Sequence, residues 1–165
     1  VPAAFFLVGN NIEKNADLVR RMVAEGHTVG NHTMHHYDMS KLTEPAAFQK
    51  ELTALETLYE TVVGQPMKKY YRPPQGTYSE ENLKQASAAG YKTVFWSFAY
   101  ADWDNKKQPD PAAAKKKILD SLHNGAVLLL HPTSATNAAI LGDVLRELKA
   151  LGSRFGTLDE LTGGD

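Results

Sequence analysis

The chain has 165 residues, 42% of them hydrophobic and 22% charged, a composition that is typical of a globular domain and excludes a disordered chain. A formal net charge of −1 predicts no nucleic-acid partner, and no apolar run approaches the ~20 residues that a membrane span needs. The chain contains no cysteine, so disulfide bonds and thiolate zinc sites are excluded.

The first part of the chain predicts two strands, each followed by a helix. Residues 3–8 form a continuous apolar run typical of a buried strand, and residues 27–30 predict a shorter one. The strongest helical pattern lies in residues 48–62 and ends at Gly64. An earlier helix ending near Gly26 is predicted by the apolar positions Ile12, Ala16, Val19 and Val23.

The rest of the chain continues this alternation. Short strands are predicted at residues 70–71, 93–98 and 126–130 and around Phe155. Ser79 and Asp110 are typical N-caps of the helices that follow them, and Gly90 ends the first of these helices. The apolar positions expected to face the core are Leu83, Ala86, Ile118, Leu122, Ile140, Val144, Leu148 and Leu151.

Strands that alternate with helices predict an α/β fold with a parallel sheet or barrel. The predicted strands are fewer than the eight of a closed barrel, so either the barrel is irregular or a strand is missing before Val1. The chain begins directly in a predicted strand and without an initiator methionine. We therefore expect it to come from the interior of a longer gene product.

A cluster of histidines follows the strand predicted at residues 27–30. His32 and His36 are four positions apart, which on a helical turn places their Cβ atoms about 5–6 Å from each other. Two imidazoles at that spacing can bind one divalent metal ion. Thr33 stands where a zinc protease carries glutamate, so the segment supplies ligands but no general base. His35 is predicted to be a neighbour rather than a ligand, and a histidine-rich surface loop is the alternative interpretation.

Other reactive side chains also follow the ends of predicted strands. Arg72, Asp102 with Trp103, and His131 each stand at the end of a different strand. The C-terminal ends of parallel strands meet at one face, so we expect these side chains to share a site with the histidine pair. The alternatives are a surface cation for Arg72, an exposed turn for Asp102, a strand cap for His131, and a core or rim position for Trp103.

Taken together and in order, these motifs resemble those of the polysaccharide deacetylases of carbohydrate esterase family 4, the NodB homology domain. The family's H-[ST]-x-x-H motif corresponds to residues 32–36, and its R-x-P-x-G motif to residues 72–76. Its L-x-H motif corresponds to residues 129–131, and its D-x-x-D-W motif ends in Asp102-Trp103 with Ala99 in place of the first aspartate. The resemblance covers nearly the whole chain.

Within the family, the delta-lactam biosynthetic de-N-acetylases, which act on muramic acid in spore peptidoglycan, look most similar because of the R-P-P-x-G-T-Y-S run. Gln75 departs from the basic residue expected there. The family's first motif, T-F-D-[DN]-G, which supplies the general-base aspartate and usually a third metal ligand, is absent from the sequence. The resemblance therefore implies one N-terminally truncated NodB-like domain over residues 1–165, a distorted parallel (β/α)7-type barrel that lacks its first strand and helix.

The resemblance implies metal-dependent de-N-acetylation of a cell-wall polysaccharide, at N-acetylmuramic acid or N-acetylglucosamine. The metal would be zinc, with cobalt, nickel or manganese as alternatives, held by His32 and His36. His131 would be the general acid, Asp102 would hold its tautomer, and Arg72 would orient the missing base. The substrate-binding residues implied are Gln75, through its backbone N–H, with Leu129 and Trp103.

The implied partner is peptidoglycan or a chitin-like polysaccharide, and the implied location is extracellular or in the cell envelope. Since the general base is missing, we expect the chain by itself to bind metal weakly and to turn over little substrate. Two alternatives stay open: a catalytically incomplete glycan-binding module of the same fold, and another metal-dependent amidohydrolase. The oligomeric state is also open.

Overall fold

The computed structural model describes residues 1–163 and divides into two compact units. The sheet unit comprises Val1–Phe95 together with the C-terminal residues from Gly156, and the helix-pair unit comprises Trp96–Phe155. No helix in the described part of the chain combines the length and the apolar character that crossing a membrane requires.

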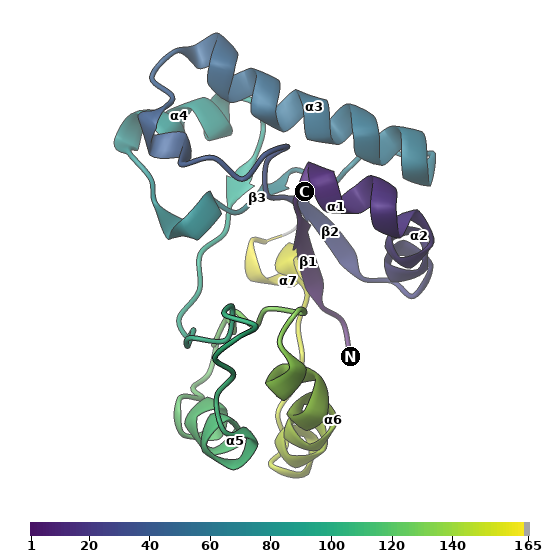
Figure 1. Cartoon of the computed structure of the whole chain (residues 1–165), viewed down its shortest axis with the longest axis vertical. Coiled ribbons are helices and arrows are strands. Elements are labelled where there is room, and N and C mark those ends of the chain that lie inside the picture. The colour runs from purple at the N-terminus through teal and green to yellow at the C-terminus, as the bar shows by residue number, and fades with distance from the viewer. Residues whose placement is uncertain (164–165) are drawn as a thin grey trace. The chain divides into compact units, whose positions relative to one another are not determined.

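The sheet unit contains a parallel sheet in the order β1 (Ala4–Leu7), β2 (Thr28–Asn31), β3 (Tyr70–Tyr71) and β4 (Lys92–Thr93). The register pairs Leu7 with Asn31, Asn31 with Tyr71, and Tyr71 with Thr93, so the four strands end level with one another. The segments that leave the sheet after β2 and β3 therefore start from the same edge (Figure 1).

Helices cover this sheet because their apolar residues recur at helical spacing. The sheet unit contains α1 (Gly9–Ile12), α2 (Ala16–Ala24), α3 (Pro45–Val63), α4 (Glu80–Ala88) and α7 (Leu158–Leu161), with 3-10 turns η1 (Glu13–Asn15), η2 (Met39–Lys41) and η3 (Pro74–Gly76). The long helix α3 packs against α1, α2 and α4 and contacts β2 (Figure 1). Its buried residues are the apolar Phe48, Leu52, Leu55 and Tyr59, together with Glu51.

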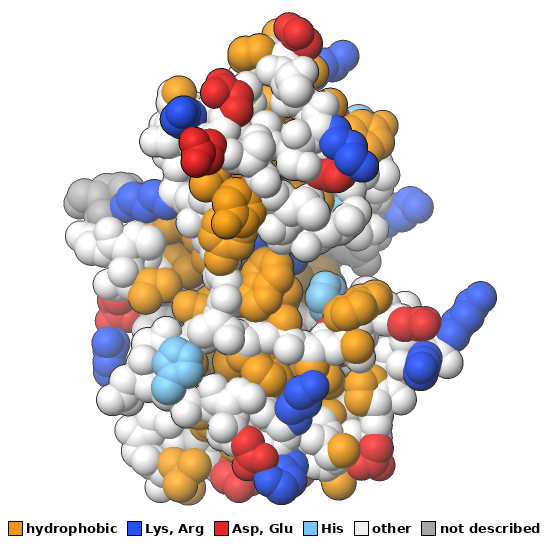
Figure 2. All heavy atoms as spheres, turned by 90° about the vertical axis from the view of Figure 1, so that its left-hand side faces the viewer, with side chains coloured by type: hydrophobic (Ala, Val, Ile, Leu, Met, Phe, Trp, Pro, Cys, Tyr) orange, Lys and Arg blue, Asp and Glu red, His pale blue; other side chains and the backbone are white. Residues whose placement is uncertain are grey.

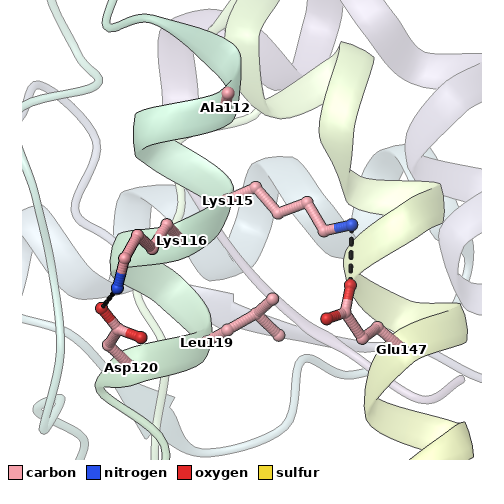
Figure 3. Close-up of a pocket in the computed structure, with 6 residues that line it drawn as sticks. All are labelled: Ala112, Lys115, Lys116, Leu119, Asp120 and Glu147. Atoms are coloured by element: carbon pink, nitrogen blue, oxygen red, sulfur yellow. Dashed lines mark hydrogen bonds and ion pairs between the residues drawn. The ribbon is translucent and has the colours of Figure 1, made fainter.

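The helix-pair unit is built on α5 (Pro111–Asp120) and α6 (Ala135–Ala150), which pack side by side. The core between them and the preceding segment consists of Phe98, Tyr100, Ala114, Ile118, Ile140, Val144 and Leu148. A hollow of about 390 Å³ lies between the two helices. Figure 3 shows Lys115 reaching across it to Glu147, at 2.7 Å, while Lys116 pairs with Asp120 along α5. The hollow contains no predicted site residue.

Helix ends agree with the sequence-based predictions. The side chains of Ser79 and Asp110 accept hydrogen bonds from the backbone N–H groups of Asn82 and Ala113, as N-caps do. The helix α3 ends at Gly64 in the left-handed conformation, at φ 79°, which a residue with a Cβ adopts only at a cost.

Some predicted elements are wrong. The helix expected from Ile12 to Val23 is interrupted by η1, and Leu151, expected in the core, is 71% exposed. The short helix α7 was not predicted, although Thr157 and Glu160 form a capping box at its start.

Three predicted strands are also wrong in length or absent. The strand expected at residues 93–98 stops with β4 at Thr93, no strand forms at Phe155, and residues 126–130 make only an isolated bridge between Leu128 and Phe98. One cause is visible at Ser97, whose hydroxyl accepts the hydrogen bond of the Val127 N–H at 3.0 Å. A side chain thus takes the place of a ladder carbonyl there.

Candidate functional site

The histidine pair follows β2 directly. The His32 backbone N–H donates to the Leu7 carbonyl at 3.1 Å and so extends the β1–β2 ladder by one bond. The chain then turns, and the rings of His32 and His36 meet edge to face with their centroids 4.8 Å apart. The sequence therefore predicts correctly that these two imidazoles come together.

The predicted helical turn between them is wrong. Residues 33–36 form a bend in which Thr33 and His36 have left-handed backbones, at φ 68° and 60°. That conformation costs an L-residue about 1–2 kcal/mol. Side chains offset the cost: Asn31 Oδ1 accepts from the Thr33 N–H, and Thr33 Oγ1 accepts from the His36 N–H, each at 2.9 Å.

The His32 ring is fixed by Arg72, the residue that follows β3. Its Nδ1 lies 2.6 Å from the Arg72 carbonyl oxygen, and because a carbonyl can only accept, Nδ1 carries the proton. In the neutral ring Nε2 then holds the lone pair that metal ligation requires. The residue is buried, with 7% of its surface exposed.

Arg72 extends the β2–β3 ladder in the same way, since its N–H donates to the Asn31 carbonyl at 3.0 Å. Its guanidinium lies 5.0 Å from the centre of the Phe6 ring, and burial lowers the pKa of Arg72 to about 10. It is therefore a partly buried cation rather than a surface one. The turn after it places Gln75 in an exposed position with a left-handed backbone, at φ 58°.

The histidine pair supplies nitrogen ligands only. Within residues 1–163 no group of three or more His, Asp or Glu side chains lies close enough together to hold a metal ion. Zinc in proteins is bound by three or four protein ligands, and imidazole nitrogens are common among them. His32 and His36 can supply two of these ligands, and the Arg72 carbonyl fixes the tautomer of His32. The fit is therefore partial.

The helix-pair unit contains a second constellation around Asp102. This side chain is fully buried, and its Oδ1 accepts from Nδ1 of His131 at 2.6 Å. Its Oδ2 accepts from the His131 backbone N–H at 2.7 Å and from the Asn137 side chain at 2.6 Å. Asp102 is thus no exposed turn residue. A carboxylate on Nδ1 leaves Nε2 of His131 as the nitrogen that can exchange a proton with a ligand.

Two more residues, which the sequence pattern did not indicate, support this pair. Asn137 also donates to the His131 carbonyl at 3.1 Å, and the Tyr100 hydroxyl donates to the Asn137 side-chain oxygen. Burial, and then the charge of Asp102, raises the pKa of Tyr100. The available signal was the position of Asn137, three residues after the Ser134 N-cap and therefore at the open end of α6.

The remaining predicted residues of this unit surround His131. The ring of Trp103 lies edge-on to the His131 ring, with a centroid distance of 6.2 Å, and Trp103 is 61% exposed. Leu129 is partly buried and its N–H donates to the Phe98 carbonyl. His131 itself keeps a third of its side chain exposed, at 33%.

The structure therefore groups the predicted residues into two sets. His32, His36, Arg72 and Gln75 belong to the sheet unit, and Asp102, Trp103, Leu129 and His131 to the helix-pair unit. The prediction that both sets serve one substrate stays a prediction.

Charged side chains of both signs are mixed on one face of the molecule (Figure 2). On the face shown in Figure 2, basic and acidic side chains are interspersed, and neither sign forms a continuous patch. This agrees with the net charge of −1.

Comparison with known proteins gives a consistent result. The family model described as polysaccharide deacetylase matches residues 1–94. The peptidoglycan-N-acetylmuramic acid deacetylase PdaA of Bacillus subtilis is 37% identical over 161 residues, which cover 98% of this chain and 61% of PdaA. A peptidoglycan-N-acetylglucosamine deacetylase of Bacillus cereus is 32% identical over 164 residues, or 96% of this chain and 74% of that protein.

The solved structures that match this chain belong to the same family as these relatives. The structure of B. subtilis PdaA, a family 4 carbohydrate esterase, matches with a TM-score of 0.93 and 36% identity over 98% of this chain and 69% of that one. BA3943 of Bacillus anthracis, a family pseudoenzyme, matches with a TM-score of 0.87 and 27% identity over 98% of this chain and 55% of its own. These similarities confirm the predicted α/β fold class with parallel strands. The deacetylases that match have this fold in the form of a distorted (β/α)7 barrel. The chain spans only 49–61% of the length of the first curated relatives.

Proposed function

The chain belongs to the polysaccharide deacetylase family, and from that premise we propose that it serves the metal-dependent de-N-acetylation of a cell-wall polysaccharide. The reaction would hydrolyse the amide of an N-acetyl sugar with one water to give acetate and the free amine. The observation that carries the proposal is the buried Asp102 carboxylate on Nδ1 of a partly exposed His131.

The histidine pair would hold the metal ion. His32 and His36 offer two imidazoles whose rings already lie together, and the Arg72 carbonyl fixes the His32 tautomer. A divalent ion supplies polarisation of the acetyl carbonyl and a water of lowered pKa when it is bound. Zinc is the metal we propose, with cobalt, nickel or manganese as alternatives.

His131 would deliver the proton that the leaving amine requires. An amine is a poor leaving group, and an acid placed beside it contributes typically 10²–10⁴-fold in rate. Asp102 holds the imidazole with its proton on Nδ1, so Nε2 is the atom that would carry the transferred proton. Asn137 and the His131 backbone N–H occupy the second oxygen of Asp102, which fixes the orientation of the carboxylate.

The other predicted residues would orient the substrate. The backbone N–H of Gln75, at the tip of the turn after Arg72, would donate to the oxyanion, and Arg72 would orient the general base. Leu129 would line the pocket of the acetyl methyl group. Trp103, 61% exposed, would present its ring to a sugar face.

The proposed substrate is peptidoglycan. PdaA is named for N-acetylmuramic acid and the B. cereus relative for N-acetylglucosamine, and these are the two sugars we propose. With a polymer of the cell wall as substrate, the reaction would take place in the envelope or outside the cell.

A glycan-binding module without catalysis is the second candidate. One observation favours it: the fold also occurs in a named pseudoenzyme. The pair of imidazoles without a third described ligand agrees with either candidate.

The test compares the chain with a PdaA fusion, in which this chain follows the PdaA segment that precedes its matched region. Acetate and free amine released from N-acetylated peptidoglycan fragments are measured with added zinc, and glycan binding by calorimetry. We expect both proteins to bind the glycan, and the fusion to release acetate at least about 10²-fold faster, since the general base contributes that much.

Two results would change the proposal. Equal rates for the chain and the fusion would show that the assignment of an absent base is wrong. A fusion that binds glycan but releases no acetate would favour the binding module instead.

A further inference from the structure

The loop that carries the histidine pair is held through every one of its backbone N–H groups. The N–H groups of residues 32–36 all have an acceptor. His32 uses the Leu7 carbonyl of β1, Thr33 uses the side chain of Asn31 at the end of β2, and His36 uses the side chain of Thr33. The two N–H groups between them, of Met34 and His35, both donate to Glu51 of α3.

Glu51 makes three bonds to two neighbouring loop residues. Its backbone carbonyl accepts from the Met34 N–H at 3.2 Å, and its Oε2 accepts from the His35 N–H at 3.0 Å. Its Oε1 accepts from Nδ1 of the His35 ring at 2.7 Å. Both carboxylate oxygens are therefore bonded to the residue immediately before His36.

The next residue of α3 contacts the start of the same loop. The Leu52 carbonyl accepts from the Asn31 side-chain amide at 3.0 Å, and the Tyr91 hydroxyl lies 2.8 Å from that amide nitrogen. Asn31 in turn holds the left-handed Thr33. One turn of α3 thus contacts Asn31 before the bend and Met34 and His35 within it.

The Glu51 carboxylate is buried against the loop that carries the histidine pair. Its side chain is 10% exposed, and a carboxylate at that depth is costly unless hydrogen bonds satisfy it. The Tyr37 ring stacks on a face of the His35 ring, with a centroid distance of 5.2 Å and an interplanar angle of 20°. The ring of His35 is therefore held by Glu51 at Nδ1 and by Tyr37 at one face.

We propose that Glu51 is a positioning residue for the histidine pair: its two-oxygen contact with His35 sets the backbone of His36 so that the two imidazoles meet. The inference rests on the proposed function in that the pair is taken as the metal site. The length of the Glu51 side chain lets both carboxylate oxygens bond His35. We infer that this length, rather than the negative charge, positions the loop.

Two substitutions separate reach from charge. Glu51→Asp keeps the charge but is one methylene shorter, so it cannot meet both donors. Glu51→Gln keeps the reach: its oxygen can accept from the His35 N–H while its amide donates to Nδ1 of the neutral ring, whose proton then moves to the other nitrogen. The matched controls are Glu60→Asp and Glu60→Gln, on an exposed residue of the same helix.

Two measurements on the whole chain provide the readouts. Zinc affinity is measured by calorimetry, and contact between the His32 and His36 rings by NMR cross-relaxation in the metal-free protein, with thermal unfolding as a check of the fold. We expect Glu51→Asp to lower zinc affinity about 10–100-fold, as loss of an outer-shell partner does, and to weaken the ring contact. Glu51→Gln should stay near the wild type, and both Glu60 variants should match it.

The opposite order would overturn the inference: an unchanged Glu51→Asp with a weakened Glu51→Gln would mean that the carboxylate acts through its charge. Unchanged ring contact in both variants would also overturn it. If the wild type binds no zinc, the proposed metal site fails, and the ring contact in the metal-free variants still decides whether Glu51 positions the pair.

Discussion

Asp102 shows how much of this site depends on the surroundings of single residues. Its carboxylate is fully buried and accepts from three donors, two on His131 and one on Asn137. A residue with three acceptor bonds fixes both the position and the tautomer of its histidine.

Replacing Asp102 by Asn tests that role. The amide of Asn can present a donor to Nδ1 of His131, so the ring proton is expected to move from Nδ1 to Nε2, as nitrogen-15 NMR of the imidazole would show. In the PdaA fusion, kcat should fall by about 10²-fold or more, because the amide cannot stabilise the imidazolium that would deliver the proton to the leaving amine. The control is Asp143→Asn, an exposed aspartate on α6. An Nδ1 proton that stays in place in Asp102→Asn would contradict this role.

At the scale of residues, the sequence predicts which residues belong to the site better than it predicts their backbone conformations. The positions of Arg72, Asp102 and His131 after strand-like segments were enough to single them out. The left-handed backbones of Thr33 and His36 could not be predicted, because Thr and His rarely adopt them without specific side-chain acceptors such as Asn31 Oδ1. Glu51 and the contact of Asn137 with Asp102 were missed because the partners, 16 and 35 residues away, are distant in sequence.

At the scale of elements, Gly30 in the middle of β2 decides how closely the strands approach. A Cβ at this position would lie 2.7 Å from an edge carbon of the Phe6 ring and 3.1 Å from the Tyr70 carbonyl. Phe6 lies on β1 and Tyr70 on β3, so the contact would push against both neighbours of β2. The glycine is therefore needed for space rather than for its backbone angles.

We expect Gly30→Ala to lower the free energy of unfolding by about 1–3 kcal/mol, as overpacking does. The control is Gly142→Ala in α6, where the nearest atom to a new Cβ is the end of the Arg146 side chain at 3.5 Å. That change should be neutral or stabilising by up to about 1 kcal/mol, since alanine favours a helix. Urea unfolding measures both, and equal stabilities for the two variants would contradict the packing argument.

Asp38 connects the segment after β2 to the one after β3. Its Oδ1 accepts from the Ser40 hydroxyl at 2.6 Å and from the Thr77 hydroxyl at 2.9 Å. These bonds, that of Ser40 first, lower the pKa of Asp38 from 3.8 to about 2. A lowered pKa in the folded state means that the contribution of Asp38 to stability is complete above pH 3.8 and is lost as the pH falls toward 2.

Replacing Asp38 by Asn should therefore destabilise the protein at neutral pH and matter less and less below pH 3.8. Thermal unfolding from pH 7 to pH 2 measures the difference between variant and wild type. Asp17→Asn, at a fully exposed aspartate, is the control and should change little. A difference that grows as the pH falls would contradict the assignment.

Helices were predicted better than strands for a physical reason. The apolar period and the caps Ser79 and Asp110 are local signals, and the structure confirms them. A strand depends on its neighbour, and at residues 93–98 the side chain of Ser97 takes the bond that a ladder would have used. Nothing in the local sequence indicates that exchange.

On the scale of the whole molecule, two units each carry half of the predicted chemistry. The sheet unit holds the imidazole pair and Arg72, and the helix-pair unit holds Asp102 and His131. The order of these residues along the chain, more than any one contact, indicated the family, and the match to polysaccharide deacetylases confirms it. The central claim is that both halves take part in the same turnover.

A double-mutant cycle on acetate release tests that claim most directly. In the PdaA fusion, His36→Ala and His131→Ala are each expected to lower kcat on N-acetylated peptidoglycan by about 10²-fold or more. Because residues that act as one unit are strongly non-additive, the double variant should be little slower than the slower single variant. A His131→Ala fusion that releases acetate at the unmodified rate, or two losses that simply multiply, would contradict the account.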